Sequence, residues 1–131
     1  MNAKRLLDLA RFLDELPRAE FDFADVVTEQ DGGCGSVCCA VGWTPRVFPE
    51  LVEWCQRGDY DLDVTMRNTK WPENGYILVG SCLFDITRDE ATALFTPGYR
   101  RPWAGGAGPL HSTATPKQVA ASIREFVGYR P

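Results

Sequence analysis

The chain has 131 residues, of which 44% are hydrophobic and 24% charged, and its length fits one domain that needs no metal or disulfide for stability. Its net charge of −4 argues against general affinity for nucleic acid or anionic membranes. No apolar stretch approaches the roughly 18 residues of a membrane span, and no secretory leader pattern is present. We expect a single cytoplasmic domain over residues 1–131, with its five cysteines as reduced thiols.

An amphipathic helix is predicted near the start of the chain. Asn2 is a suitable amino-terminal cap, and Pro17 is a suitable stop. Between them the apolar residues recur at helical spacing, which is typical of a helix lying on a globular core. These apolar residues are Leu6, Leu9, Ala10, Leu13 and Leu16.

The stretch from Gly33 to Trp43 contains no charged residue and is rich in glycine, alanine and cysteine. The absence of charge indicates burial, and small side chains allow neighbouring backbones to approach closely. We therefore predict a short central helix here, with Cys34 near its amino end and the amphipathic helices packed around it.

The region after this stretch gives mixed signals. The Pro49-Glu50 pair resembles a helix start and predicts a helix over roughly Pro49 to Gln56. Strict alternation from Asp59 to Met66 then predicts a short strand. Residues 76–79 could close a hairpin on that strand, giving a hairpin at 60–79, yet residues 77–84 also suit one face of a helix. Both alternatives stay open on this evidence.

Two helix starts are predicted in the last third of the chain. Thr87 and Glu90 form a capping box. Thr115 and Gln118, with Pro116 at the first helical position, form a second one, and the helix that follows is predicted to end at Gly128. Between these helices, residues 97–112 are rich in glycine and proline and predict a flexible loop. The predicted fold is mainly α, with α+β as the alternative: four to five short helices around the small-residue central helix.

Three sequence patterns together resemble those of a family of small, uncharacterised proteins of bacteria, phages and mobile elements. The patterns are Cys34-Gly35-Ser36-x-x-Cys39-Ala40-x-Gly42-Trp43, Leu83-Phe84-x-Ile86-Thr87-x-Asp89-Glu90-Ala91-x-x-Leu94-Phe95 and Thr115-Pro116-x-x-Val119-Ala120-x-x-Ile123-x-x-Phe126. The resemblance implies a helix rather than a strand for residues 77–84, and it carries no activity that can be transferred. Asp85 stands where the pattern usually has glycine, and a left-handed backbone at this position would come at some cost, because aspartate tolerates positive φ less easily than glycine.

The cysteines suggest two kinds of chemistry, zinc binding and nucleophilic catalysis. Cysteines are soft zinc ligands, but no C-x-x-C pair occurs, and Cys38 and Cys39 would diverge by about 100° on a helix. Cys34 at a helix amino end could act as a nucleophile with His111 as its base, but nothing in the sequence places them together. We interpret the cysteines as small buried hydrophobes and expect no metal or other cofactor.

Residues 97–112 contain the best candidate for a working surface. Arginine and tryptophan are enriched at interface hot spots, and they also stack on nucleotide bases, although the tryptophan could equally fold back onto the core. The predicted surface residues are Tyr99, Arg100, Arg101, Trp103 and His111.

The function predicted from these features is binding of a protein partner, without catalysis, as an accessory or inhibitory factor of bacterial, phage or mobile-element origin. A small cysteine-dependent enzyme or zinc-binding module is the alternative. We expect no direct nucleic-acid binding and no membrane association, and the sequence does not indicate an oligomeric state. The structural motif residues are Cys34, Gly35, Cys39, Gly42, Trp43, Thr87 and Glu90.

Overall fold

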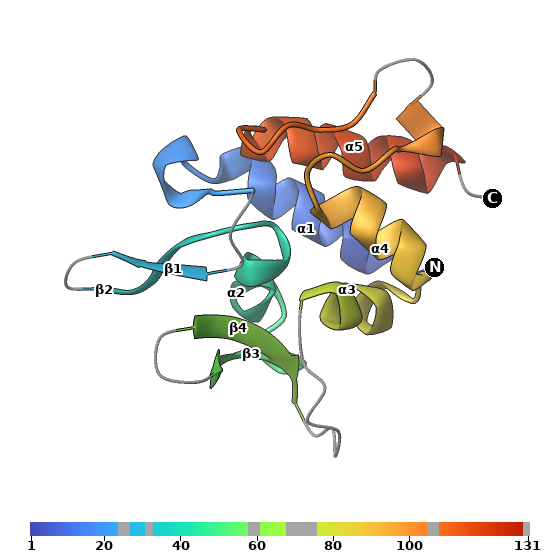
Figure 1. Cartoon of the computed structure of the whole chain (residues 1–131). Helices are drawn as coiled ribbons and strands as arrows, with labels where there is room; N and C mark the ends of the chain where they lie inside the picture. Colours follow the sequence, from blue (N-terminus) through green and yellow to red (C-terminus); the bar gives the residue numbers. More distant parts are fainter. Residues whose placement is uncertain (24–26, 31–32, 58–60, 68–75, 105–107, 130–131) are drawn as a thin grey trace.

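The computed structural model describes residues 1–23, 27–30, 33–57, 61–67, 76–104 and 108–129, and within them the chain is mainly helical with two small antiparallel hairpins (Figure 1). This confirms the predicted mainly α class. The α-helices are α1 (Ala3–Glu15), α2 (Thr44–Val47), α3 (Tyr76–Phe84), α4 (Arg88–Phe95) and α5 (Pro116–Tyr129). The strands are β1 (Val27–Gln30), β2 (Gly33–Cys38), β3 (Val52–Arg57) and β4 (Asp61–Met66), and the 3₁₀ turns are η1 (Arg18–Glu20), η2 (Val41–Trp43) and η3 (Pro102–Ala104). None of the described helices is long and apolar enough to cross a membrane.

The first and last helices pack side by side (Figure 1). The predicted cap of α1 is confirmed, because the Asn2 side chain accepts a hydrogen bond from the Arg5 amide at 3.1 Å. At the other end of α1, Asp14 pairs with Arg124 of α5, and this hydrogen bond lowers the pKa of the Asp14 carboxyl. The helices thus join segments from opposite ends of the chain.

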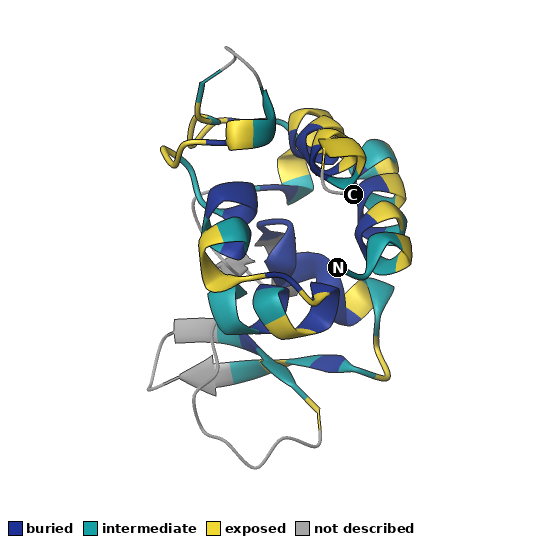
Figure 2. Ribbon diagram, turned by 90° about the vertical axis from the view of Figure 1, so that its right-hand side faces the viewer, coloured by how far each residue is buried: buried dark blue, intermediate teal, exposed yellow. Residues whose placement is uncertain are grey.

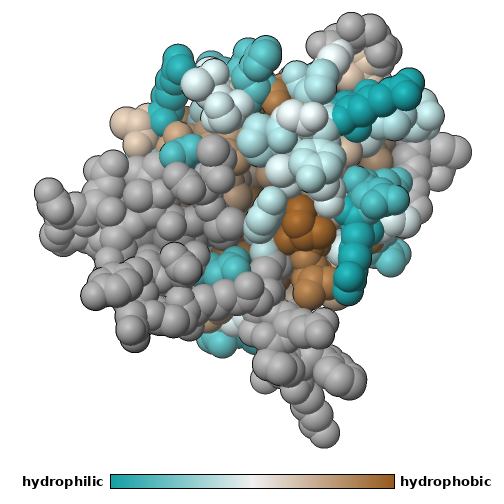
Figure 3. Space-filling view, viewed as in Figure 1, coloured by the Kyte–Doolittle hydropathy of each residue, from teal (hydrophilic) through white to brown (hydrophobic). Residues whose placement is uncertain are grey.

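The inward faces of the helices form one buried apolar cluster (Figure 2). Phe84 is fully buried in this cluster, with its ring centroid 5.6 Å from that of Phe95 and 6.2 Å from that of Phe48. Some apolar side chains are exposed at the surface, where Figure 3 shows a hydrophobic patch over α3. That helix carries the half-buried Ile77 and Leu78.

The predicted central helix over Gly33 to Trp43 is wrong. Residues Gly33–Cys38 form β2, which pairs with β1 in an antiparallel hairpin, and only the following residues turn into η2 and α2. A run of small uncharged residues indicates burial but has no period that separates helix from strand. Here the pairing of Val27 with Cys38 and of Gln30 with Gly33 satisfies the backbone as a strand.

The predicted helix over Pro49 to Gln56 is also wrong, because Val52–Arg57 is strand β3. The alternating residues that follow it do form a strand, as predicted, over Asp61–Met66. This strand pairs with β3 before it and not with residues 76–79 after it, so the hairpin lies at 52–66 and the 60–79 alternative is wrong. Residues Tyr76–Phe84 form α3, which confirms the helix implied by the family resemblance.

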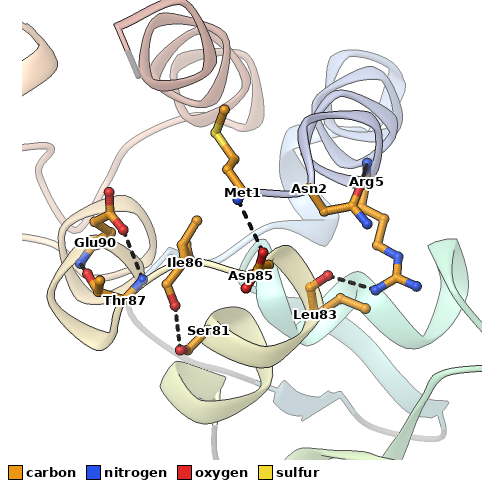
Figure 4. Close-up of polar contacts among 9 residues, drawn as sticks. All are labelled: Met1, Asn2, Arg5, Ser81, Leu83, Asp85, Ile86, Thr87 and Glu90. Atoms are coloured by element: carbon orange, nitrogen blue, oxygen red, sulfur yellow. Dashed lines mark hydrogen bonds and ion pairs between the residues drawn. The ribbon is translucent and has the colours of Figure 1, made fainter. Parts of the chain in front are cut away.

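The α3–α4 corner is tied to the start of α1 (Figure 4). Asp85 has φ of 52°, so it adopts the left-handed backbone that glycine tolerates more easily than aspartate. The Phe84 carbonyl accepts a hydrogen bond from the Asn2 amide at 2.6 Å, and the Leu83 carbonyl accepts one from Arg5 Nη1 at 2.9 Å. The carbonyls that α3 leaves unpaired at its end are therefore used to hold α1.

Both predicted capping boxes are confirmed. The Thr87 hydroxyl accepts from the Glu90 amide at 3.1 Å, and the Glu90 carboxylate accepts from the Thr87 amide at 2.9 Å (Figure 4). Thr115 and Gln118 repeat this exchange at the start of α5, at 3.2 and 2.8 Å. The predicted stop at Gly128 is wrong by a residue, because α5 runs to Tyr129.

Candidate functional site

The described parts of the 97–112 loop fold back against α5. Arg101, predicted as a surface residue, is only 8% exposed. Its Nη1 donates to the Ser122 hydroxyl at 3.0 Å, while its Nε and Nη2 both donate to the Gly108 carbonyl, at 3.1 and 2.7 Å. The guanidinium therefore joins the two arms of the loop to the helix.

Trp103 lies in η3 and also faces α5. Its ring meets Phe126 edge to face, with 4.9 Å between the centroids, and its Nε1 donates to the Ser122 hydroxyl at 3.4 Å. The structure thus gives Trp103 the core-capping role that stood as the alternative to an exposed hot spot. A T-shaped aromatic pair of this kind contributes about 0.5–1.5 kcal/mol beyond the area it buries.

Tyr99 and Arg100, by contrast, project from the same loop into solvent. Tyr99 is 52% exposed, and Arg100 is exposed as well. The preceding Gly98 has φ of 84°, a conformation that favours glycine, and its amide donates to the Leu110 carbonyl at 2.9 Å. The loop therefore presents an aromatic ring and a cation on a backbone that is fixed on both sides.

The five predicted surface residues consequently divide into two sets. Tyr99, Arg100 and His111 are exposed, whereas Arg101 is buried and Trp103 is half-buried. Sequence reasoning missed Ser122, the acceptor shared by Arg101 and Trp103. The sequence does hold an indication of this role, because Ser122 falls among the buried apolar positions of the last helix. A buried hydroxyl needs a hydrogen-bond partner.

Burial suppresses the reactivity of Cys38 and Cys39, the two cysteines of the central motif whose side chains the structure describes. Burial raises the pKa of Cys38 to about 12 and that of Cys39 to about 12, which leaves both thiols protonated at neutral pH. The Cys39 sulfur accepts from the Gly42 amide at 3.4 Å. Cys34 lies in β2 and not at a helix amino end, so the helix-dipole argument for its thiolate no longer applies.

The remaining motif residues hold neighbouring elements together. Trp43 Nε1 donates to the Glu20 carbonyl at 2.9 Å, and Trp54 Nε1 donates to the Gly42 carbonyl at 2.7 Å. The two indole rings meet edge to face. Cys34 and Gly35 lie in β2, and the side chain of Cys34 is outside the described part of the structure.

A metal site would need several ligands side by side. Within the described residues no group of three or more histidine, cysteine, aspartate or glutamate side chains could hold a metal ion. Cys55 is half-buried, Cys82 is exposed and His111 lies in the 97–112 loop, so the side chains that the structure describes do not gather the soft ligands that the zinc hypothesis requires.

Comparison with known proteins found no match among family models, curated proteins or solved structures. The geometry of the 97–112 loop is therefore the main evidence on function. The candidate site consists of the exposed residues Tyr99 and Arg100. The neighbouring Arg101 and Trp103 hold the loop on α5.

Proposed function

We propose that this chain is a non-enzymatic protein that binds a protein partner through Tyr99 and Arg100. The observation that carries the proposal is the division of the 97–112 loop into anchored and exposed residues. Arg101 and Trp103 are fixed on α5, whereas Tyr99 and Arg100 are exposed beside them. Catalysis has no comparable support in the described residues.

Tyrosine and arginine are two of the three residue types most enriched at interface hot spots. A mobile loop would lose conformational entropy on binding, at about 0.5–1.5 kcal/mol for each side chain that becomes ordered. The hydrogen bonds from Gly98 to Leu110 and from Arg101 to Gly108 and Ser122 reduce that cost, because they fix the loop before the partner arrives. The loop is thus suited to docking as a preformed surface.

The charge distribution favours an acidic surface on the partner. Residues 88–131 carry six basic and three acidic side chains, although the whole chain has a net charge of −4. Complementary charge raises the rate of encounter and selects among partners. An accessory or inhibitory role follows if the chain covers part of that partner's surface. The family resemblance supports a bacterial, phage or mobile-element origin, and we place the protein in the cytoplasm.

The proposal is tested by immobilising the wild-type protein and a Tyr99→Ala/Arg100→Ala variant and comparing captured bacterial proteins by quantitative mass spectrometry. The control is Leu7→Ala/Arg11→Ala, which removes an exposed apolar side chain and an exposed arginine from α1. We expect one partner to be retained by wild type and control and lost from the loop variant. With purified partner, calorimetry should show a Kd weakened at least about 30-fold, corresponding to the ~2 kcal/mol of a hot spot.

Circular dichroism of the loop variant provides the folding check, because both substituted side chains are exposed. Equal capture by all three proteins would refute the role of the loop. Capture of no specific partner by the wild type would refute the proposed function.

A further inference from the structure

A second feature of the molecule lies outside the Tyr99 and Arg100 surface. A pocket of about 450 Å³ opens between η1, the segment 109–115 and the first turn of α5. Figure 1 shows that η1 and the start of α5 lie at one end of the α1–α5 pair. The polar side chains that line it are Arg18, Arg101, His111, Thr113, Thr115 and Gln118. Neither Tyr99 nor Arg100 is among its lining residues.

The buried guanidinium of Arg101 has no counter-charge in the described part of the chain. Its three hydrogen bonds go to neutral oxygens, two to the Gly108 carbonyl and one to the Ser122 hydroxyl. Arginine carries five N–H donors, so one N–H on each terminal nitrogen is left without an acceptor among the described residues. Burying a charge is costly unless it is paired, so this cation favours an anion beside it.

The other charged groups around the pocket are also positive. Arg18 forms no ion pair with any described residue, and the described lining includes no carboxylate. The amino end of α5 at Thr115 adds the partial positive charge of the helix dipole. Thr113 supplies a hydroxyl and His111 an imidazole within the same wall. The pocket therefore concentrates positive charge in a chain whose overall charge is negative.

We propose that this pocket binds the phosphate group of a small phosphorylated molecule. Guanidinium forks match phosphate oxygens, and a phosphate has three oxygens to share among Arg18, Arg101, the Thr113 hydroxyl and the His111 imidazole. The volume lies in the range of about 300–1,000 Å³ that is typical of small-molecule sites, so there is room for an organic group beyond the phosphate. This inference does not depend on the proposed protein partner.

The first test titrates the full chain with inorganic phosphate by calorimetry and by ¹H–¹⁵N NMR, against chloride at matched ionic strength. We expect saturable binding, with shifts at His111 and Gln118. Arg18→Gln should weaken the affinity at least 10-fold. Arg88→Gln is the matched control, because it removes an exposed arginine that does not line the pocket, and it should bind as the wild type does.

Arg18 is the key position because it is exposed, so its variant should stay folded even if substitutions of Arg101 do not. Equal weakening by Arg18→Gln and Arg88→Gln would mean that only overall charge matters and would overturn the proposal. Absence of saturable binding in the wild type would overturn it too.

The source of the phosphate is tested with glucose 6-phosphate, AMP, acetate and a short phosphoserine peptide. We expect one of the two phosphorylated small molecules to bind more tightly than inorganic phosphate, and acetate to bind more weakly. Tightest binding by the phosphoserine peptide would overturn the assignment to a small molecule. In every arm the Tyr99→Ala/Arg100→Ala variant should bind as wild type does, which keeps this result separable from the protein-partner test.

Discussion

Cys39 shows how the core controls the chemistry of a single side chain. The thiol is buried beside that of Cys38, and desolvation raises the pKa of Cys39 to about 12 from a usual value of 9.0. The unfolded chain exposes the same thiol, which there loses its proton near pH 9. Between pH 9 and 12 the unfolded state therefore binds fewer protons than the folded state, and stability must fall as the pH rises.

We accordingly expect the free energy of unfolding to decline above pH 9, by up to about 1.4 kcal/mol per pH unit for each buried thiol. Cys39→Ala removes one of these thiols and should make the decline shallower, although the variant itself is less stable at neutral pH. Urea unfolding at pH 8, 9 and 10 at constant ionic strength measures the slope. Cys82→Ala, which removes an exposed thiol, serves as the control. Identical slopes in wild type and Cys39→Ala would contradict the argument.

At the scale of elements, α3 and α4 approach closely because Gly80 has no side chain. A Cβ placed on Gly80 would lie 3.2 Å from two ring carbons of Phe95. Phe95 is buried and packed against Phe84, so its ring has little room to move. Gly128 in α5 provides the opposite case, since nothing lies within 4 Å of a Cβ built there.

This contrast predicts opposite outcomes for the same substitution. Gly128→Ala should stabilise the protein by about 0.5–1 kcal/mol, because alanine is the better helix former and meets no obstacle. Gly80→Ala gains the same propensity but overpacks the α3–α4 contact, at about 1–3 kcal/mol, so we expect a net loss of stability. Thermal unfolding of the two variants side by side measures the difference. A Gly80→Ala variant as stable as Gly128→Ala would show that the Phe95 ring can yield.

The elements that could be predicted from sequence are those with local signals. Thr87 with Glu90 and Thr115 with Gln118 define helix starts within four residues, and both starts are confirmed. The strands at 33–38 and 52–57 depend on pairing with other segments, and no local pattern specifies that pairing. Tertiary context therefore decided the two segments for which the predicted helices were wrong.

For the candidate site, the sequence predicts the location of the loop but not the orientation of its side chains. The glycine- and proline-rich stretch with its arginines and tryptophan marked the 97–112 loop as notable. Which of those side chains face outward depends on Ser122 and Phe126, which lie about 20 residues further along the chain. Arg18 had no visible link to this region, because η1 reaches it only through the packing of the folded molecule.

At the scale of the whole molecule, the packing of α1 against α5 joins the two ends of the chain. Leu9 of α1 is fully buried, whereas Leu7 on the same helix is 39% exposed. Leu9→Ala should lower the free energy of unfolding by about 2–5 kcal/mol, through lost burial and the cavity left behind. Leu7→Ala should change it by no more than about 0.5 kcal/mol. Urea unfolding monitored by tryptophan fluorescence measures both, and equal effects would mean that the α1 face is not part of the cooperative core.

The same pairing has a consequence for synthesis on the ribosome. The ion pair between α1 and α5 joins residues 110 positions apart. Translation at about 5–20 residues per second separates the appearance of these two helices by roughly 5–20 s. During that interval the apolar face of α1 has emerged without the helix that covers it. The nascent chain therefore exposes the leucine-rich face of α1 until α5 is made, and apolar surface exposed in this way is prone to aggregation.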